Sequence, residues 1–146
     1  MTCKPHAWRR RPRRGGAILE LSITLALLLN LTFGMVEFGY YFYVKNAFEN
    51  AAREGVRTAM TPSGTTTTTT TAVTNALSAY KFPANCVTTT VTDTSGNTLD
   101  PSTAAIGTAI QVNLTATWST IGAGFRPLTL ISGSKSVTGY CVMQKE

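Results

Sequence analysis

The chain has 146 residues, a formal net charge of +6 at pH 7 and 43% hydrophobic residues, which suits a single domain with a modest core. The first 14 residues hold six basic side chains and no acidic one, whereas the rest of the chain holds seven of each sign. The positive charge is therefore a local topological signal rather than a basic face for phosphate groups, which argues against nucleic-acid binding.

An almost uninterrupted apolar stretch, residues 16–36, follows the basic head, and its one charged residue is Glu20. Its length corresponds to about 31 Å of helix, which matches the hydrocarbon core of a bilayer. The stretch is too long for the apolar region of an ordinary signal peptide, and no small-x-small cleavage site follows it. Basic residues before a span keep the N-terminus in the cytoplasm. The sequence therefore predicts a single-pass membrane protein whose C-terminal part is exported.

The helix is predicted to continue well beyond the membrane. No proline occurs between residues 37 and 60, and the first stop signal is the Thr-Pro-Ser-Gly sequence at 61–64. One helix over residues 17–60 would be about 65 Å long, with half of it in lipid and half projecting.

The remainder of the chain changes pattern several times. A turn and seven consecutive threonines predict a linker over residues 61–71, interpreted as a solvated spacer with O-glycosylation as the alternative. Helical spacing predicts a short helix over 72–81, and period-two alternation predicts strands over 86–92, 109–120 and 135–144. Three strands with short or irregular connections predict a small antiparallel sheet, with one face packed on the projecting helix or the short helix.

The predicted fold class is α+β, in which a long N-terminal α-helix, its first half transmembrane, precedes a short helix and a small antiparallel β-sheet. The predicted segments are a basic leader, a transmembrane and projecting helix, a threonine-rich linker and an exported α+β domain. Their bounds are 1–15, 16–60, 61–71 and 72–146.

Three cysteines occur in the chain, and one of them, Cys3, lies in the basic head. Cys86 and Cys141 both fall in predicted strands on the exported side, where the compartment permits oxidation. We expect a disulfide between them, which would stabilise the domain by roughly 4 kcal/mol in the chain-entropy model. The alternative is two buried free thiols.

The sequence carries no recognisable enzyme site. The only histidine, His6, lies in the basic head, so the exported part has no histidine to activate a serine or cysteine nucleophile. CxxC, HExxH, Walker and GxGxxG sequences are all absent from the chain. We therefore expect a protein that is not an enzyme and that uses neither a metal nor a cofactor.

Two carboxylates in or beside the apolar stretch need a reason, because a charge in a membrane is costly. Glu20 lies one turn inside the span. Its position alone allows it to reach back to the cytoplasmic headgroups and arginines, or to pair with a positive amine in an assembly. Glu37 lies at the outer edge of the span, where it is either an interfacial carboxylate in contact with water or one half of an intersubunit ion pair.

The junction between the head and the span resembles the start of a type IV pilin-class prepilin. A basic leader ends at Gly15 and is followed by Gly16-Ala17-Ile18-Leu19-Glu20 and a long apolar helix. In that class a membrane aspartic peptidase cuts after the glycine, and glutamate is the fifth residue of the mature chain. A cut between Gly15 and Gly16 makes Glu20 the fifth residue, so the resemblance implies cleavage at that bond.

The rest of the helix resembles the TadE-like family, the minor pseudopilins of the tight-adherence (Flp) pilus system. The matching segments are Phe33–Tyr43, Asn46–Ala47 and Asn50–Arg57, which follow a family pattern close to F-G-x-x-E-x-G-R-x-x-x, N-A and N-A-A-R-E-G-A-R. Tyr40 stands where the family commonly has arginine. The resemblance covers about residues 13–60 and does not extend to the C-terminal domain.

This resemblance implies a bacterial inner-membrane pseudopilin with its C-terminal domain in the periplasm. It would be processed by the system's prepilin peptidase and would act in assembly of the Flp pilus, and so in adherence and biofilm formation. Its partners would be that peptidase, other pilins and pseudopilins, the pilus assembly machinery and the lipid bilayer. Glu20 would pair with the new amine of Gly16 on an adjacent subunit, since a carboxylate in a low dielectric is tolerated mainly when paired.

Two alternatives stay open. The first is an uncleaved, signal-anchored envelope protein whose exported domain is a binding module. The second is a pseudopilin of another pilin-class machine, such as type II secretion, although the segment from Glu37 to Arg57 favours the tight-adherence system.

Overall fold

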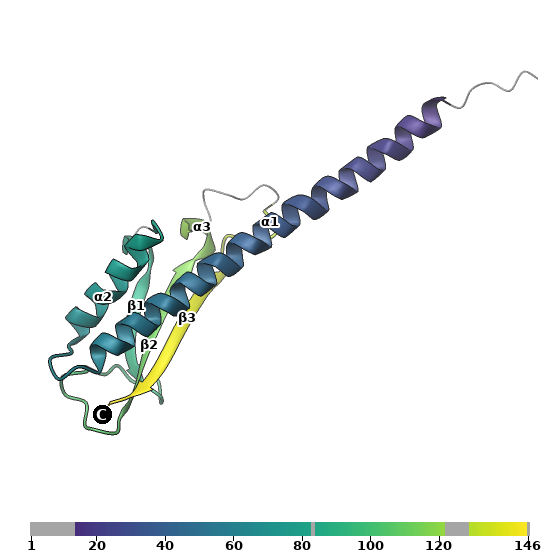
Figure 1. The fold of residues 1–146 in the computed structure, drawn as a ribbon. Coiled ribbons are helices and arrows are strands. Elements are labelled where there is room, and N and C mark those ends of the chain that lie inside the picture. The colour runs from purple at the N-terminus through teal and green to yellow at the C-terminus, as the bar shows by residue number, and fades with distance from the viewer. Residues whose placement is uncertain (1–13, 83, 122–128, 146) are drawn as a thin grey trace, which may run out of the picture.

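The structure, a computed structural model, describes residues 14–82, 84–121 and 129–145. A long helix, α1 (Arg14–Ala59), dominates it, and the first half of this helix extends away from the folded domain (Figure 1). The predicted α+β fold class is confirmed. The other elements are α2 (Thr66–Ala79), a 3₁₀ turn (Ala84–Cys86), β1 (Thr88–Asp93), β2 (Ala109–Thr117), α3 (Trp118–Ile121) and β3 (Ser136–Gln144).

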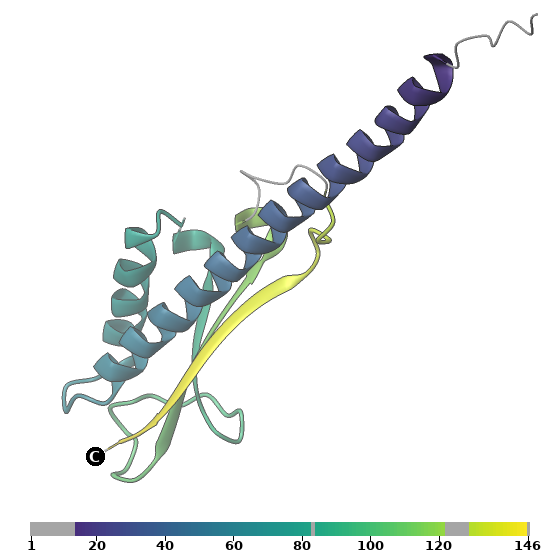
Figure 2. The same ribbon diagram turned by 45° about the vertical axis from the view of Figure 1, so that its right-hand side comes forward.

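The three strands form one antiparallel sheet in the order β1-β2-β3, as the sequence predicts. In its middle, Val112 of β2 lies opposite Val91 of β1 and Cys141 of β3. Alternate residues of β2 from Ile110 to Ala116 are buried, because that face packs against α1. Figure 2 shows α1 and α2 side by side on one side of the sheet, so the domain has two layers.

Helix α1 changes character along its length. Between residues 18 and 36 its large apolar side chains are all exposed, whereas from residue 44 its apolar residues recur on one face and are buried. The predicted helix over 17–60 is thus one continuous element that serves two environments. The buried face consists of Val44, Ala47, Phe48, Ala51, Ala52, Val56 and Ala59.

Two glycines set the distance between the layers. A Cβ added at Gly139 of β3 would lie 2.6 Å from the Cβ of Phe48 and 2.8 to 2.9 Å from backbone atoms of Phe48 and Glu49. A Cβ added at Gly55 of α1 would lie 2.5 Å from Cγ2 of Val73 in α2. The absence of a side chain at these positions therefore allows α1 to approach both the sheet and the second helix closely.

The threonine run is not the linker predicted for residues 61–71, because α2 already begins at Thr66. Thr65 is the N-cap and forms a reciprocal capping box with Thr68. The Thr68 amide donates to Oγ1 of Thr65 at 3.1 Å, and the Thr65 amide donates to Oγ1 of Thr68 at 2.8 Å. The helix predicted over 72–81 therefore starts six residues earlier.

Burial of one threonine adds to this start signal. Thr69 is fully buried, and its Cγ2 lies 3.7 Å from the Cβ position of Gly55. The hydroxyls of Thr69, Thr70 and Thr71 each donate to the carbonyl four residues earlier, at 2.8 to 2.9 Å. The cap and the packing of Thr69 together offset the low helix propensity of threonine.

The strand predictions hold except at the ends of the strands. Cys86 belongs to the 3₁₀ turn before β1 rather than to the strand. The strand predicted over 109–120 ends at Thr117, and Trp118 begins the short helix α3. Trp118 is nevertheless fully buried, as its alternation with Ile110 and Ala116 suggests.

The predicted disulfide is wrong for this structure, in which Cys86 and Cys141 are both free and partly buried. Cys141 lies in β3 at one edge of the sheet, and Cys86 precedes β1, which forms the other edge. Because β2 runs between them, the two cysteines are separated by about two strand spacings, roughly 10 Å, before any offset along the strands. That separation exceeds the reach of a disulfide, whose Cα atoms lie within about 7 Å.

We predict that Gly139→Ala destabilises the domain by roughly 1–3 kcal/mol, because the new methyl group meets backbone atoms of α1 that cannot move independently. Chemical unfolding of the full chain in detergent, followed by circular dichroism, measures this. Gly39→Ala is the control, because a Cβ at Gly39 meets nothing within 4 Å and alanine favours the helix. Equal stability of Gly139→Ala and wild type would contradict the close contact.

We also predict that Cys86 and Cys141 both react with iodoacetamide when the chain is denatured without reductant. The reason is their placement at opposite edges of the sheet. Peptide mass analysis measures the label at Cys86 and Cys141. Unlabelled, linked peptides from monomeric protein would instead establish the bond and contradict the present strand arrangement.

Candidate assembly surface on helix α1

The first half of α1 is an apolar rod that the described protein does not cover. Its mean hydropathy reaches 1.8, and Leu27 and Met35 are 69% and 70% exposed. By length and composition, α1 is the one helix in the described part of the chain that is able to cross a membrane. An exposed apolar surface of this size is expected to meet lipid or another protein.

The uncharged polar side chains of this rod form their hydrogen bonds within the helix. Each donates a hydrogen bond of 2.8 to 3.0 Å to the carbonyl oxygen four residues earlier, so none of these donors needs water. Glu20 differs, because its carboxylate has no hydrogen bond or ion pair within the described residues. The self-satisfied side chains are those of Ser22, Thr24, Asn30 and Thr32.

The predicted cleavage bond lies in the first turn of α1. A Cβ added at Gly15 or Gly16 would meet nothing within 4 Å, so no other described part of the chain packs on these glycines at that position. Each glycine lowers local helix stability by about 1 kcal/mol relative to alanine, and helix ends fray most easily. The structure therefore brings Gly15, Gly16 and Glu20 together within about one and a half turns, at the far end of the helix from the domain.

Glu37 is fully buried, which contradicts its interpretation as a carboxylate in contact with water. The segment that leads into β3 folds back onto α1 here, and the Ile131 amide donates to Oε1 of Glu37 at 3.0 Å. Oε2 of Glu37 is buried with no hydrogen-bond partner. Gly34, one turn earlier, lets Cδ1 of Leu130 come within 3.4 Å of its Cβ position. The intersubunit ion pair at Glu37 stays a prediction.

An aromatic cluster lies one turn beyond Glu37. The rings of Tyr40 and Tyr41 have their centroids 5.7 and 5.4 Å from that of Trp118. The Tyr40 hydroxyl donates to the carbonyl of Ile121 at 3.3 Å, and burial raises its pKa above the ordinary value, with a smaller contribution from Tyr43. Tyr40, where the family commonly has arginine, therefore holds α3 against α1 through a neutral hydroxyl.

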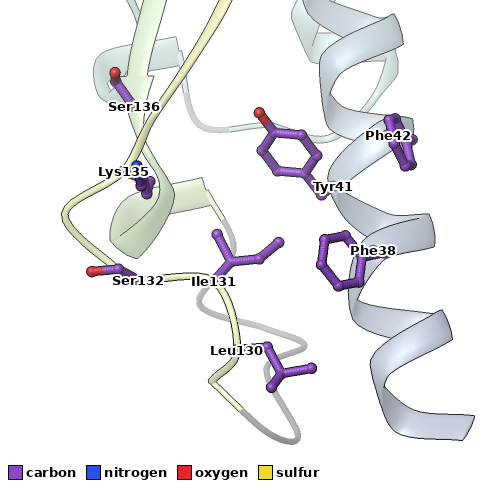
Figure 3. Close-up of a pocket in the computed structure, with 8 residues that line it drawn as sticks. All are labelled: Phe38, Tyr41, Phe42, Leu130, Ile131, Ser132, Lys135 and Ser136. Atoms are coloured by element: carbon purple, nitrogen blue, oxygen red, sulfur yellow. The ribbon is translucent and has the colours of Figure 1, made fainter. Parts of the chain in front are cut away.

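A groove of about 510 Å³ separates α1 from the chain that returns into β3. In Figure 3, Leu130 and Ile131 reach from the returning chain toward the aromatic side chains of α1. Sequence analysis missed this groove, because its two walls are about 90 residues apart in the chain. It is lined by Phe38, Tyr41, Phe42, Leu130, Ile131, Ser132, Lys135 and Ser136.

The two aspartates of the domain shape turns. Oδ1 of Asp93 accepts hydrogen bonds from the amides of Asn97 (2.8 Å) and Ser95 (2.9 Å), and the Asn97 amide does most to hold the pKa of Asp93 below its usual value. The Ser102 amide does the same for Asp100. The described residues contain no group of three or more His, Cys, Asp or Glu side chains that could hold a metal ion.

Part of helix α1 matches a known protein family. Residues 15–57 match the family described as TadE-like protein. The matched range lies entirely in α1, includes Gly15, Glu20 and Glu37, and stops before α2. No curated protein and no solved structure matches the chain.

We predict that Glu37→Ala destabilises the domain by roughly 1–3 kcal/mol, because it removes the acceptor of the buried Ile131 amide. Glu37→Gln keeps an acceptor oxygen in place and is expected to lie within about 1 kcal/mol of wild type. Hydrogen exchange at the Ile131 amide should accelerate in the alanine variant alone. Equal exchange in both variants would show that the hydrogen bond does not hold the returning chain.

Proposed function

We propose that this chain, whose long helix matches the TadE-like protein family over residues 15–57, is a minor pseudopilin of a tight-adherence (Flp) pilus system. In this proposal it is anchored in the bacterial inner membrane with its N-terminus in the cytoplasm. A prepilin peptidase processes it, and it acts in pilus assembly and so in adherence and biofilm formation. Its partners are that peptidase, other pilins and pseudopilins, and the pilus assembly machinery.

One observation carries the proposal. The same unbroken helix is an uncovered apolar rod over residues 18–36 and the central core element of a folded domain over residues 44–59. An ordinary membrane anchor needs no such continuity, since a flexible linker would hold a binding domain as well. A subunit that packs by its helix needs the domain held at a fixed position relative to the rod, which α1 provides.

Glu20 gives the second line of support. It is the charged residue of the apolar rod, and its carboxylate has no partner within the described residues. After cleavage between Gly15 and Gly16, the new N-terminal amine would be the positive group nearest to the membrane end of each subunit. A carboxylate in lipid is stabilised chiefly by such a partner, and an adjacent subunit supplies one.

We predict that the intact mass of membrane-extracted protein begins at Gly16 only when the prepilin peptidase is present. Gly15→Ala is expected to retain the 15-residue leader, because peptidases of this class cut after glycine. Gly39→Ala, at an equally open glycine of the same helix, is the control and should be cut normally. Full-length wild-type protein in both strains would favour the alternative, an uncleaved envelope protein with a binding module.

Glu20→Ala extends the same experiment to assembly. The variant should reach the membrane and be cut largely as wild type, yet piliation measured by electron microscopy of cells should be impaired. Loss of cutting would instead assign Glu20 to peptidase recognition. Normal piliation by a processed Glu20→Ala protein would show that the proposed pairing with Gly16 is wrong.

A further inference from the structure

Two apolar hollows on α1 join into one track. The groove between α1 and the returning chain includes Phe38, and a second, mostly apolar hollow along the helix also includes it. The second hollow is lined by Asn30, Leu31, Gly34, Met35 and Phe38. From Leu31 to Phe42 the track covers about 17 Å of helix rise. It therefore runs continuously from inside the apolar rod to beyond its end.

The charge that lines the track is confined to one end. Lys135 lies on the rim beside Ser132 and Ser136, it is exposed, and its ammonium has no ion pair within the described residues. Leu31 and Met35 mark the other end and are 63% and 70% exposed. The track is thus largely apolar, with one cationic side chain at the end farther from the N-terminus of α1. Its occupant should therefore be an apolar chain that carries a negative charge at one end.

The distance of the cationic end beyond the predicted span matches the headgroup layer of a bilayer. If residues 16–36 span the hydrocarbon core, Phe38 and Phe42 lie about 3 and 9 Å beyond it by helix rise. The headgroup layer of one leaflet is about 5–8 Å thick, and aromatic and lysine side chains are favoured there. Lys135, across the groove from these rings, therefore lies at the depth of lipid phosphates.

We propose that this track binds one anionic phospholipid of the outer leaflet, with an acyl chain along Leu31, Gly34 and Phe38 and its phosphate at Lys135. The charge at one end favours a lipid over a neighbouring apolar helix, because an apolar groove that ends at the exposed Lys135 matches an acyl chain joined to a phosphate. The inference rests on the membrane placement proposed above.

Hydrogen bonds to the rest of the domain hold the wall opposite α1 in place, because the amides of Trp118 and Ser119 donate to the carbonyls of Lys135 and Gly133. Ile131 donates to Glu37, which holds the returning chain beside the helix, and Leu130 then covers Gly34. The groove is consequently built before any lipid arrives. Preorganisation of this kind lowers the entropy lost on binding.

The first test is native mass spectrometry of the full chain in detergent, with phosphatidylglycerol or phosphatidylcholine of the same acyl chains added. The wild type should retain phosphatidylglycerol in preference. Lys135→Gln should lower that retention about fivefold, the effect of one lysine near an anionic surface. Lys45→Gln is the matched control, because Lys45 is exposed on α1 about 14 Å beyond the span and should not contribute. Equal retention of both lipids by the wild type overturns the site.

A second test identifies the occupant in cells. Phe42 is 58% exposed, so a photoreactive benzoylphenylalanine at this position should fold normally. Irradiation should yield a phospholipid adduct on the peptide that contains residue 42, detected by mass. A cross-link to another pilin-class subunit as the main product would show that protein fills the groove, and would overturn the lipid site.

Membrane fractionation separates the two proposals. A chain that stays in the membrane fraction but shows neither lipid preference nor lipid adduct overturns the phospholipid site alone. A chain found outside the membrane overturns the proposed placement and the lipid site together.

Discussion

The packing of α1 on the sheet is the contact on which the rest of the structure depends. Phe48 lies directly over Gly139, where the sheet has no side chain, so the helix axis is held close to β3. The fully buried residues of α1 flank this point and pair with the inward residues of β2. α2, the aromatic cluster and the returning chain all contact α1, and each takes its position from it.

This arrangement places the buried polar atoms without a partner at the boundary between the rod and the domain. On the N-terminal side of this boundary, α1 is apolar, and its uncharged polar side chains donate hydrogen bonds to carbonyl oxygens of the same helix. On the C-terminal side, the sheet and α2 cover one face of the helix. At the boundary itself, Glu37 is buried with one backbone amide as partner, and Trp118 is buried with its indole nitrogen unpaired. Unsatisfied polar atoms are uncommon in protein interiors, and their presence here marks the place where the domain closes over the helix.

The sequence was sufficient for the elements with strong periodicity. Unbroken apolar and helical patterns predicted α1, and the alternation from Ile110 to Ala116 predicted the central strand and its buried face. The threonine run was misjudged because composition suggested a spacer, whereas the Thr65–Thr68 capping box and the buried Thr69 decided for helix. A hydroxyl residue three positions before another, ahead of an apolar helical pattern, was the signal available for this start.

Contacts between residues far apart in the chain could not be predicted from the sequence. The hydrogen bond from Ile131 to Glu37 joins residues 94 positions apart, and no local pattern indicates it. The disulfide was inferred from compartment and count, yet strand order decides whether two cysteines meet, and β2 lies between them. Gly55 is another example, because its residue type lowers helix propensity and only the fold shows that it is the contact point for Val73.

The continuity of α1 also has a mechanical consequence. The helix has 46 residues and no proline, so it is a stiff lever about 69 Å long with a folded load at one end. Tilting its N-terminal end by about 10° would displace the far end by about 12 Å, and an axial pull on either end would be transmitted to the other. A movement of the N-terminal end therefore changes both the orientation and the position of the sheet.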